Sequence, residues 1–163
     1  MSVDTYHPET AKRAIESGVD IINCVYAESI PEMIRVIADA AQDTELVLPY
    51  RLGDEKVRRE TEDASIANRL YLDPMIGFGT TREEDIELLR SIPELAKKGR
   101  VLVGASRKRI VKKLVGEKSA VGKNVGGNVA IAVWAAMNGA SVVRVHDVKD
   151  TVQALRVVEK LRG

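Results

Sequence analysis

A short β-branched segment near the end of the chain carries two side chains that can bind an anion. Residues 142–148 read Val-Val-Arg-Val-His-Asp-Val. Side chains two positions apart in a strand point to the same side, so Arg144 and His146 are predicted to face one way. A guanidinium group and an imidazole both donate hydrogen bonds to phosphate oxygens. The segment therefore indicates the edge of an active site.

Six strand-like segments must position such residues, and each is followed by a helix or a candidate helix. We predict strands over residues 2–5, 19–25, 45–48, 69–72, 101–103 and 141–145. Helical patterns follow over residues 8–17, 30–41, 82–92, 110–114, 128–137 and 152–161, with capping boxes expected at Ser29 and Thr81. Repeated βα units imply parallel strands with helices packed outside them, so the predicted fold class is α/β, of the (β/α) barrel kind.

Composition limits the possible classes of protein. The chain has 163 residues, of which 45% are hydrophobic and 30% charged, and its formal net charge is +1. These values describe one ordinary globular unit and give no support for nucleic-acid or membrane binding. No apolar run approaches the roughly 20 residues that span a bilayer, and we expect a cytoplasmic protein. The single cysteine, Cys24, lies in an apolar stretch and is expected to be a buried, inert thiol.

Polar side chains recur where the predicted strands end. In a (β/α) barrel these carboxyl ends gather into one mouth, so a single binding pocket explains them better than five separate helix caps or turns. Two carboxylates and an amide suit a flat heterocycle with amino and ring N–H groups, whereas three cationic side chains suit an oxo group or phosphates. A reduced pterin carrying a pyrophosphate fits both halves of the set, which comprises Asp4, Asn23, Asp73, Lys108, Arg144 and His146.

The same segments resemble dihydropteroate synthase, in the family's order and across nearly the whole chain. The resemblance rests on Ser2-Val3-Asp4-Thr5, Ile21-Ile22-Asn23, Leu72-Asp73-Pro74-Met75-Ile76-Gly77-Phe78-Gly79, Leu102-Val103-Gly104-Ala105-Ser106-Arg107-Lys108 and Arg144-Val145-His146-Asp147-Val148. It implies an incomplete barrel of the dihydropteroate synthase type, with about six of eight βα units. Residues 1–163 would then form a single pterin-binding, barrel-like domain that lacks the first two units.

The resemblance also implies a role for each site residue. Asp4, Asn23, Asp73 and Lys108 are expected to bind the pterin, and Arg144 and His146 the pyrophosphate. Phe78 and Ser106 are expected on the aminobenzoate side, and the expected catalytic residues are Lys108, Arg144 and His146. The implied reaction joins a 6-hydroxymethyl-dihydropterin pyrophosphate to p-aminobenzoate in folate-type biosynthesis. No metal-ligating residue is predicted, although Mg²⁺ could accompany the pyrophosphate through a ligand region that this chain lacks.

Several positions depart from the family pattern. Cys24 stands where an aspartate is usual, Met75 where a glycine is usual, and Thr80 where a lysine is common. Methionine at position 75 is expected to exclude a backbone conformation that only glycine tolerates. Residues 53–63 are mostly charged, and we interpret them as a solvated helix or mobile connection, with a functional lid as the alternative.

The sequence leaves the activity open. The first possibility is a dihydropteroate synthase-like transferase, complete or completed by a partner chain. The alternatives are a pterin-binding module or barrel fragment without its own turnover, and a methyltetrahydrofolate-type methyltransferase relative. Six strands leave two open parallel edges, so we expect a homodimer or a partner segment to cover them.

Overall fold

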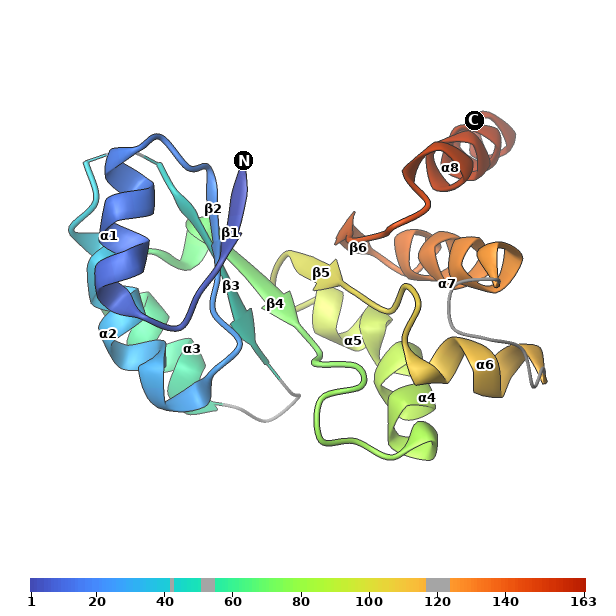
Figure 1. The fold of residues 1–163 in the computed structure, drawn as a ribbon, viewed down its shortest axis with the longest axis horizontal. Helices are drawn as coiled ribbons and strands as arrows, with labels where there is room; N and C mark the ends of the chain where they lie inside the picture. Colours follow the sequence, from blue (N-terminus) through green and yellow to red (C-terminus); the bar gives the residue numbers. More distant parts are fainter. Residues whose placement is uncertain (42, 51–54, 117–123) are drawn as a thin grey trace. The chain divides into compact units, whose positions relative to one another are not determined.

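The computed structural model describes residues 1–41, 43–50, 55–116 and 124–163. The chain forms two compact units, Met1–Asp73 and Pro74–Gly163. Within the described residues the first unit contains β1 (Ser2–Asp4), α1 (Pro8–Glu16), β2 (Ile21–Asn23), η1 (Ala27–Ser29), α2 (Ile30–Ala38), β3 (Glu45–Pro49), α3 (Glu55–Asp63), η2 (Ala67–Arg69) and β4 (Leu70–Asp73). The second contains α4 (Arg82–Arg90), α5 (Ile92–Ala96), β5 (Val101–Val103), α6 (Arg109–Val115), α7 (Val125–Met137), β6 (Ala140–Val143) and α8 (Val148–Arg162) (Figure 1).

The first unit is a parallel sheet in the order β1-β2-β3-β4, with α1, α2 and α3 on one face (Figure 1). β-branched and aliphatic residues form the strands because they pack well on a pleated, buried surface. Ile22, Leu46 and Leu48 are fully buried in this core. The register pairs Asp4 with Asn23 at the last positions of β1 and β2. The sheet therefore brings these two polar side chains next to each other at its carboxyl edge.

The second unit is built on the parallel pair β5 and β6, whose register shifts between Val101 and Leu102. Its helices pack on one another, α4 with α6, α6 with α7, and α7 with α8. The buried aliphatic side chains of this core include Ile92, Leu95 and Ile110. Because β6 ends at Val143, the segment that carries the anion-binding candidates begins directly after its last residue.

Most predicted elements are confirmed, with shifted ends. The expected strand over residues 19–25 is only Ile21–Asn23, and α7 begins at Val125 instead of residue 128. The expected strand over residues 141–145 ends earlier, at Val143, so the strand geometry from which Arg144 and His146 were predicted to face one way does not extend to them. Both residues lie in the loop between β6 and α8, although still at the carboxyl end of the strand.

The two capping-box predictions had different outcomes. At Thr81 the box is complete: its hydroxyl accepts from the Glu84 N–H, and the Glu84 carboxylate accepts from the Thr81 N–H. At Ser29 the prediction is wrong, because the side chain makes no capping hydrogen bond. The 3₁₀ turn Ala27–Ser29 leads straight into α2, so Ser29 already has helical backbone angles and is not shaped as a cap.

The structure bears on two further expectations. Met75 has a φ angle of +62°, in the left-handed region that residues other than glycine also adopt, so the exclusion of a glycine-only conformation stays a prediction. Such a conformation costs about 1–2 kcal/mol for an L-residue. The charged segment forms the helix α3, one of the two forms expected for it; Val57 and Thr61 are buried, and the helix packs against α2. Residues 53 and 54 of that segment lie outside the described residues.

Candidate functional site

The first unit contributes a pair of polar side chains at the ends of β1 and β2. The Asn23 side-chain amide donates a hydrogen bond to Asp4 Oδ1 at 3.1 Å. Asp4 is exposed, whereas Asn23 is only 3% exposed. The next residue also links the strands, because the Thr5 N–H donates to the Asn23 carbonyl at 3.0 Å. The pair is thus held by its strands and presents a carboxylate to solvent.

Asn23 also carries a buried acceptor with no partner. Its Oδ1 is the one buried side-chain oxygen or nitrogen atom, among the described residues, that has no hydrogen-bond partner. A buried carbonyl without a donor is costly, typically about 1–3 kcal/mol. A buried polar atom of this kind, beside a carboxylate at a strand end, marks a point where an N–H donor is missing.

Asp73 ends β4 in the same unit and is 6% exposed. Its backbone carbonyl accepts from the Tyr50 N–H at 2.8 Å, which continues the pairing of β3 with β4 beyond Pro49. Cys24, directly after Asn23, is fully buried, and burial raises the pKa of its thiol. The prediction of a buried thiol is therefore confirmed.

In the second unit, Lys108 organises the loop that precedes α4. Its Nζ donates to the Ile76 carbonyl at 2.5 Å and lies 4.5 Å from the centre of the Phe78 ring. An ammonium group over an aromatic face is attracted by the ring's quadrupole. Gly77 has a φ angle of +78°, and a Cβ there would lie 3.1 Å from Lys108 Cδ. Glycine is therefore favoured both by the backbone angle and by the close approach of the lysine side chain.

A buried carboxylate that the sequence analysis missed anchors the same loop. Asp85, in the first turn of α4, is 3% exposed. Its Oδ1 accepts from the Gly77 N–H at 2.7 Å and from the Thr80 hydroxyl at 2.6 Å. Thr80, a departure from the family pattern, thus has a defined partner. The three residues fix the loop that presents Phe78 to solvent.

The anion-binding candidates follow β6. The His146 N–H donates to Ser106 Oγ at 3.3 Å, and its ring Nδ1 lies 3.1 Å from the same oxygen. The Arg144 N–H donates to the Val103 carbonyl at 2.9 Å. Both side chains are exposed. The loops after β5 and β6 therefore meet at Ser106 and His146, as the sequence predicts for neighbouring strand ends.

A cluster of Arg107, Asn128 and Asp147, which was not predicted from the sequence, also joins these two loops. The Arg107 guanidinium pairs with Asp147 Oδ1 at 2.9 Å. Asn128 donates from Nδ2 to Asp147 Oδ2 at 3.0 Å, and its Oδ1 accepts from the Arg107 N–H at 2.9 Å. These contacts, the guanidinium of Arg107 first, hold the pKa of the Asp147 carboxyl below its usual range. The sequence did not indicate Asn128, because it lies on α7, away from the strand ends, and its contact with Arg107 spans 21 positions.

The structure thus forms two clusters from the predicted site residues. The first unit brings Asp4 and Asn23 together and places Asp73 at the end of a strand of the same sheet. The second brings Ser106 to His146 and Phe78 to Lys108, and places Arg144 on the loop after β6. Convergence of all these residues on one ligand stays a prediction.

No protein metal site stands out in the described part of the chain. There, no group of three His, Cys, Asp or Glu side chains could hold a metal ion. The described residues thus offer no ready ligand set for Mg²⁺. The described helices also include none that is long and apolar enough to cross a membrane.

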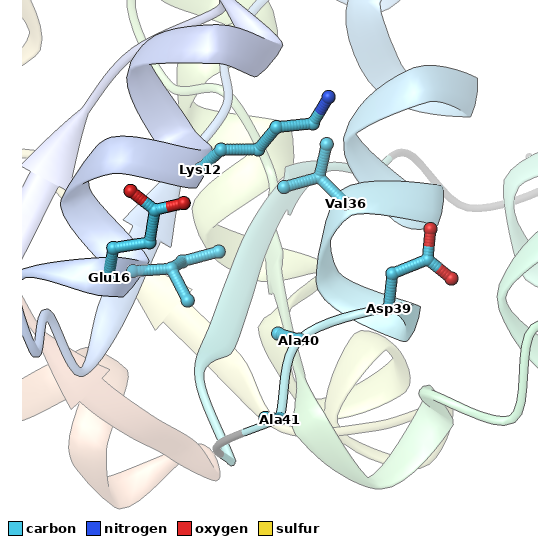
Figure 2. Close-up of a pocket in the computed structure, with 7 residues that line it drawn as sticks. Lys12, Glu16, Val36, Asp39, Ala40 and Ala41 are labelled. Atoms are coloured by element: carbon cyan, nitrogen blue, oxygen red, sulfur yellow. The ribbon is translucent and has the colours of Figure 1, made fainter.

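A groove in the first unit lies away from the strand ends that carry the candidates. It encloses about 480 Å³ between α1 and the end of α2, and Figure 2 shows its charged side chains, Lys12, Glu16 and Asp39. The ends of these helices lead into the starts of β2 and β3. In parallel βα units the binding residues gather at the opposite, carboxyl ends of the strands. The groove therefore does not belong to the candidate site.

Comparison with known proteins identifies the family. Residues 1–49 and 50–146 match the model of the family described as pterin binding enzyme. The chain therefore belongs to the pterin binding enzyme family. Dihydropteroate synthase of Streptococcus pyogenes serotype M6 is 32% identical to it, over 99% of this chain and 66% of that protein. Dihydropteroate synthase of Escherichia coli K12 is 33% identical, over 98% of this chain and 63% of its own length.

Solved structures agree with this assignment. Dihydropteroate synthase from Xanthomonas albilineans in complex with 7,8-dihydropteroate has a TM-score of 0.88 and 33% identity, covering 99% of this chain and 66% of that one. The Thermus thermophilus enzyme in complex with 4-aminobenzoate has a TM-score of 0.86 and 32% identity, covering 98% and 70%. The predicted fold class, an incomplete (β/α) barrel of this type, is confirmed. The chain spans just under two thirds of the length of the curated relatives above.

Proposed function

We propose that this chain binds a pterin and its pyrophosphate ester, and that it serves as a dihydropteroate synthase-like transferase in folate-type biosynthesis. The observation that carries the proposal is the Asp4–Asn23 pair, in which the Asn23 amide donates to an exposed carboxylate at the ends of two neighbouring strands. A pterin edge offers N–H donors to such a carboxylate. Asp73 and Lys108 complete the proposed pterin set.

The reaction needs little protein chemistry beyond positioning and charge. The amine nitrogen of p-aminobenzoate forms a bond to the pterin methylene carbon, the carbon–oxygen bond to pyrophosphate breaks, and the amine proton passes to solvent. Pyrophosphate departs with the electron pair, so the transition state gains most from donors around the leaving group. Arg144 and His146 are proposed to supply these donors, and Phe78 and Ser106 to border the aminobenzoate.

Related structures support the ligand class. The Xanthomonas albilineans protein was determined with 7,8-dihydropteroate and the Thermus thermophilus protein with 4-aminobenzoate. Binding without turnover is the second candidate function, because the whole relatives are longer than this chain. A coupled assay for pyrophosphate release in the presence of p-aminobenzoate separates the two candidates. Ligand binding with no release would favour the second one.

Calorimetric titration with 6-hydroxymethylpterin and with its pyrophosphate ester tests the site. Asp73→Ala should abolish binding of both ligands, and the near-isosteric Asp73→Asn should weaken both. Arg144→Ala should weaken only the ester. Asp39→Asn in the first unit and Arg156→Ala on α8 are matched controls that remove one charge outside the proposed site. Equal affinities across the wild type and all variants would refute the assignment.

The proposal extends to assembly and location. Within the described residues, β1 pairs with β2 and β6 pairs with β5, each along one edge. An exposed strand edge invites pairing with another chain, so we propose a homodimer or a partner segment there. Sedimentation of a monodisperse monomer, with the edge-strand amides already protected from hydrogen exchange, would count against it. A cytoplasmic location and a Mg²⁺ ion accompanying the pyrophosphate are also part of the proposal.

A further inference from the structure

Asn128 occupies a position that neither the sequence nor the comparisons assign to the site. It lies in the first turn of α7 and is 3% exposed. Both ends of its amide are engaged, Oδ1 by the Arg107 N–H at 2.9 Å and Nδ2 by Asp147 Oδ2 at 3.0 Å. One donor end faces a carboxylate and one acceptor end faces an N–H, so the amide orientation is set by its partners. Each contact reaches a different loop.

The first contact holds the loop after β5 in an unfavourable backbone conformation. Arg107 has a φ angle of +59°, in the left-handed region that is unfavourable for an L-residue. The hydrogen bond from its N–H to Asn128 compensates part of that cost. Arg107 stands between Ser106, which contacts His146, and Lys108, which reaches the Ile76 carbonyl. The directions of both neighbours therefore depend on the turn that Asn128 secures.

The second contact holds the loop after β6. Asp147 accepts from Asn128 on one oxygen and from the Arg107 guanidinium on the other. Because two donors fix its carboxylate, and because it directly precedes α8, the backbone of the preceding residue is fixed as well. That residue is His146. Asn128 thus connects two loops whose contacting residues are 40 positions apart.

We infer that Asn128 is a positioning residue for the pyrophosphate-binding groups. This inference rests on the proposed function, because it assigns Asn128 a task in the site of Arg144 and His146. With its amide buried and both ends engaged, Asn128 does not contact the ligand. It holds the loops after β5 and β6 at the spacing at which His146 meets Ser106 and at which both loops can face one anion.

An exchange of the two side chains tests this role. Asn128→Asp keeps an acceptor for the Arg107 N–H but places a second carboxylate against Asp147, whereas Asp147→Asn removes the charge that pairs with the guanidinium. In the double variant, the amide at position 147 can donate to the carboxylate at 128 and still accept from Arg107. The double variant has the same net charge as the wild type, so only the polarity of the bridge is reversed.

The assay is calorimetric titration of the full chain with inorganic pyrophosphate and, separately, with 6-hydroxymethylpterin. Each single variant should weaken pyrophosphate binding about tenfold, the size of one lost charge-assisted contact, and the double variant should restore it to within about threefold. Pterin affinity should fall less than pyrophosphate affinity, because Asp4, Asn23 and Asp73 lie in the other unit and Lys108 is the one proposed pterin residue that adjoins the turn secured by Asn128. Asn138→Asp, at the other end of α7, is the control for an added charge on that helix.

The outcomes separate the inference from the proposed function. Wild-type protein that binds neither ligand would overturn both. Pyrophosphate binding that is unchanged in the folded single variants would overturn only the positioning role, as would a folded double variant that stays as weak as the singles. If Asn128→Asp does not fold, Asp147→Asn and the double variant carry the same comparison, with thermal unfolding as the check of folding.

Discussion

Replacing Asp85 by alanine should unfold the second unit at lower denaturant. The change removes an acceptor that receives the Gly77 N–H at 2.7 Å and the Thr80 hydroxyl at 2.6 Å in a buried setting. At about 1.5 kcal/mol for each hydrogen bond to a charged acceptor, the loss is about 3 kcal/mol. The Gly77 N–H keeps its contact with the Thr80 hydroxyl at 3.1 Å, so this sum is an upper value.

Trp134 gives the assay a local probe. It is the single tryptophan of the chain, and it lies on α7 with its Nε1 donating to the Leu89 carbonyl of α4 at 3.5 Å. Its fluorescence therefore reports on the unit that contains Asp85. With a urea dependence on the order of 1.5 kcal/mol per M, the expected loss moves the unfolding midpoint by about 2 M.

Two further variants isolate the cause. Asp150→Ala removes an exposed carboxylate from the first turn of α8, which measures the helix-dipole contribution alone, about 0.5 kcal/mol. Asp85→Asn keeps an oxygen acceptor of similar shape and should lose only part of the stability. If Asp85→Ala shifts the tryptophan transition no further than Asp150→Ala does, then the two hydrogen bonds do not stabilise the unit by the expected amount.

Three other predictions concern stability and reactivity. Gly116 caps α6 at a φ angle of +69° and Gly126 lies within α7, both with open space for a Cβ, so Gly116→Ala should destabilise and Gly126→Ala should stabilise by about 1 kcal/mol each in urea titration. Equal signs for the two glycines would contradict this. Cys24, fully buried and with a raised pKa, should react with Ellman's reagent only in denaturant, and rapid labelling of the native chain would refute its burial. The pKa of Asp147 is lowered mainly by Arg107, so its folded state favours the charged form. The stability that it contributes is present above the unfolded pKa and lost as the pH falls through the folded one, below about pH 4. Asp147→Asn should reduce the fall of the urea unfolding midpoint at acid pH. An unchanged fall would exclude the Asp147 carboxylate as its source.

The order of the elements could be predicted from the sequence because local patterns encode it. The complete capping box at Thr81 and the exact span of β5 both follow from residues within a few positions. Strand ends could not be placed as well, since pairing with neighbours decides where a strand stops. The strand before Arg144 ends at Val143 although the β-branched pattern continues through Val145.

The strand-end residues of the candidate site could be predicted from the sequence, but the buried residues that hold its loops could not. Strand-end residues such as Asn23 stand out because the position is set by the strand that precedes it. Asp85 and Asn128 looked like ordinary residues in the first turns of helices. Their partners lie 8 and 21 positions away in the backbone, and only the folded chain brings these groups together.

The unpartnered Oδ1 of Asn23 has a consequence for selectivity. This oxygen is out of contact with solvent in the folded chain, so a ligand that brings an N–H reaches it only after a neighbouring group moves aside. A near relative of that ligand with an oxygen or a methyl group at the same point would leave the carbonyl unsatisfied, and sites of this kind discriminate by factors of about 10⁴. Discrimination between ring tautomers and substituted analogues would then depend on the movement that uncovers this one amide oxygen.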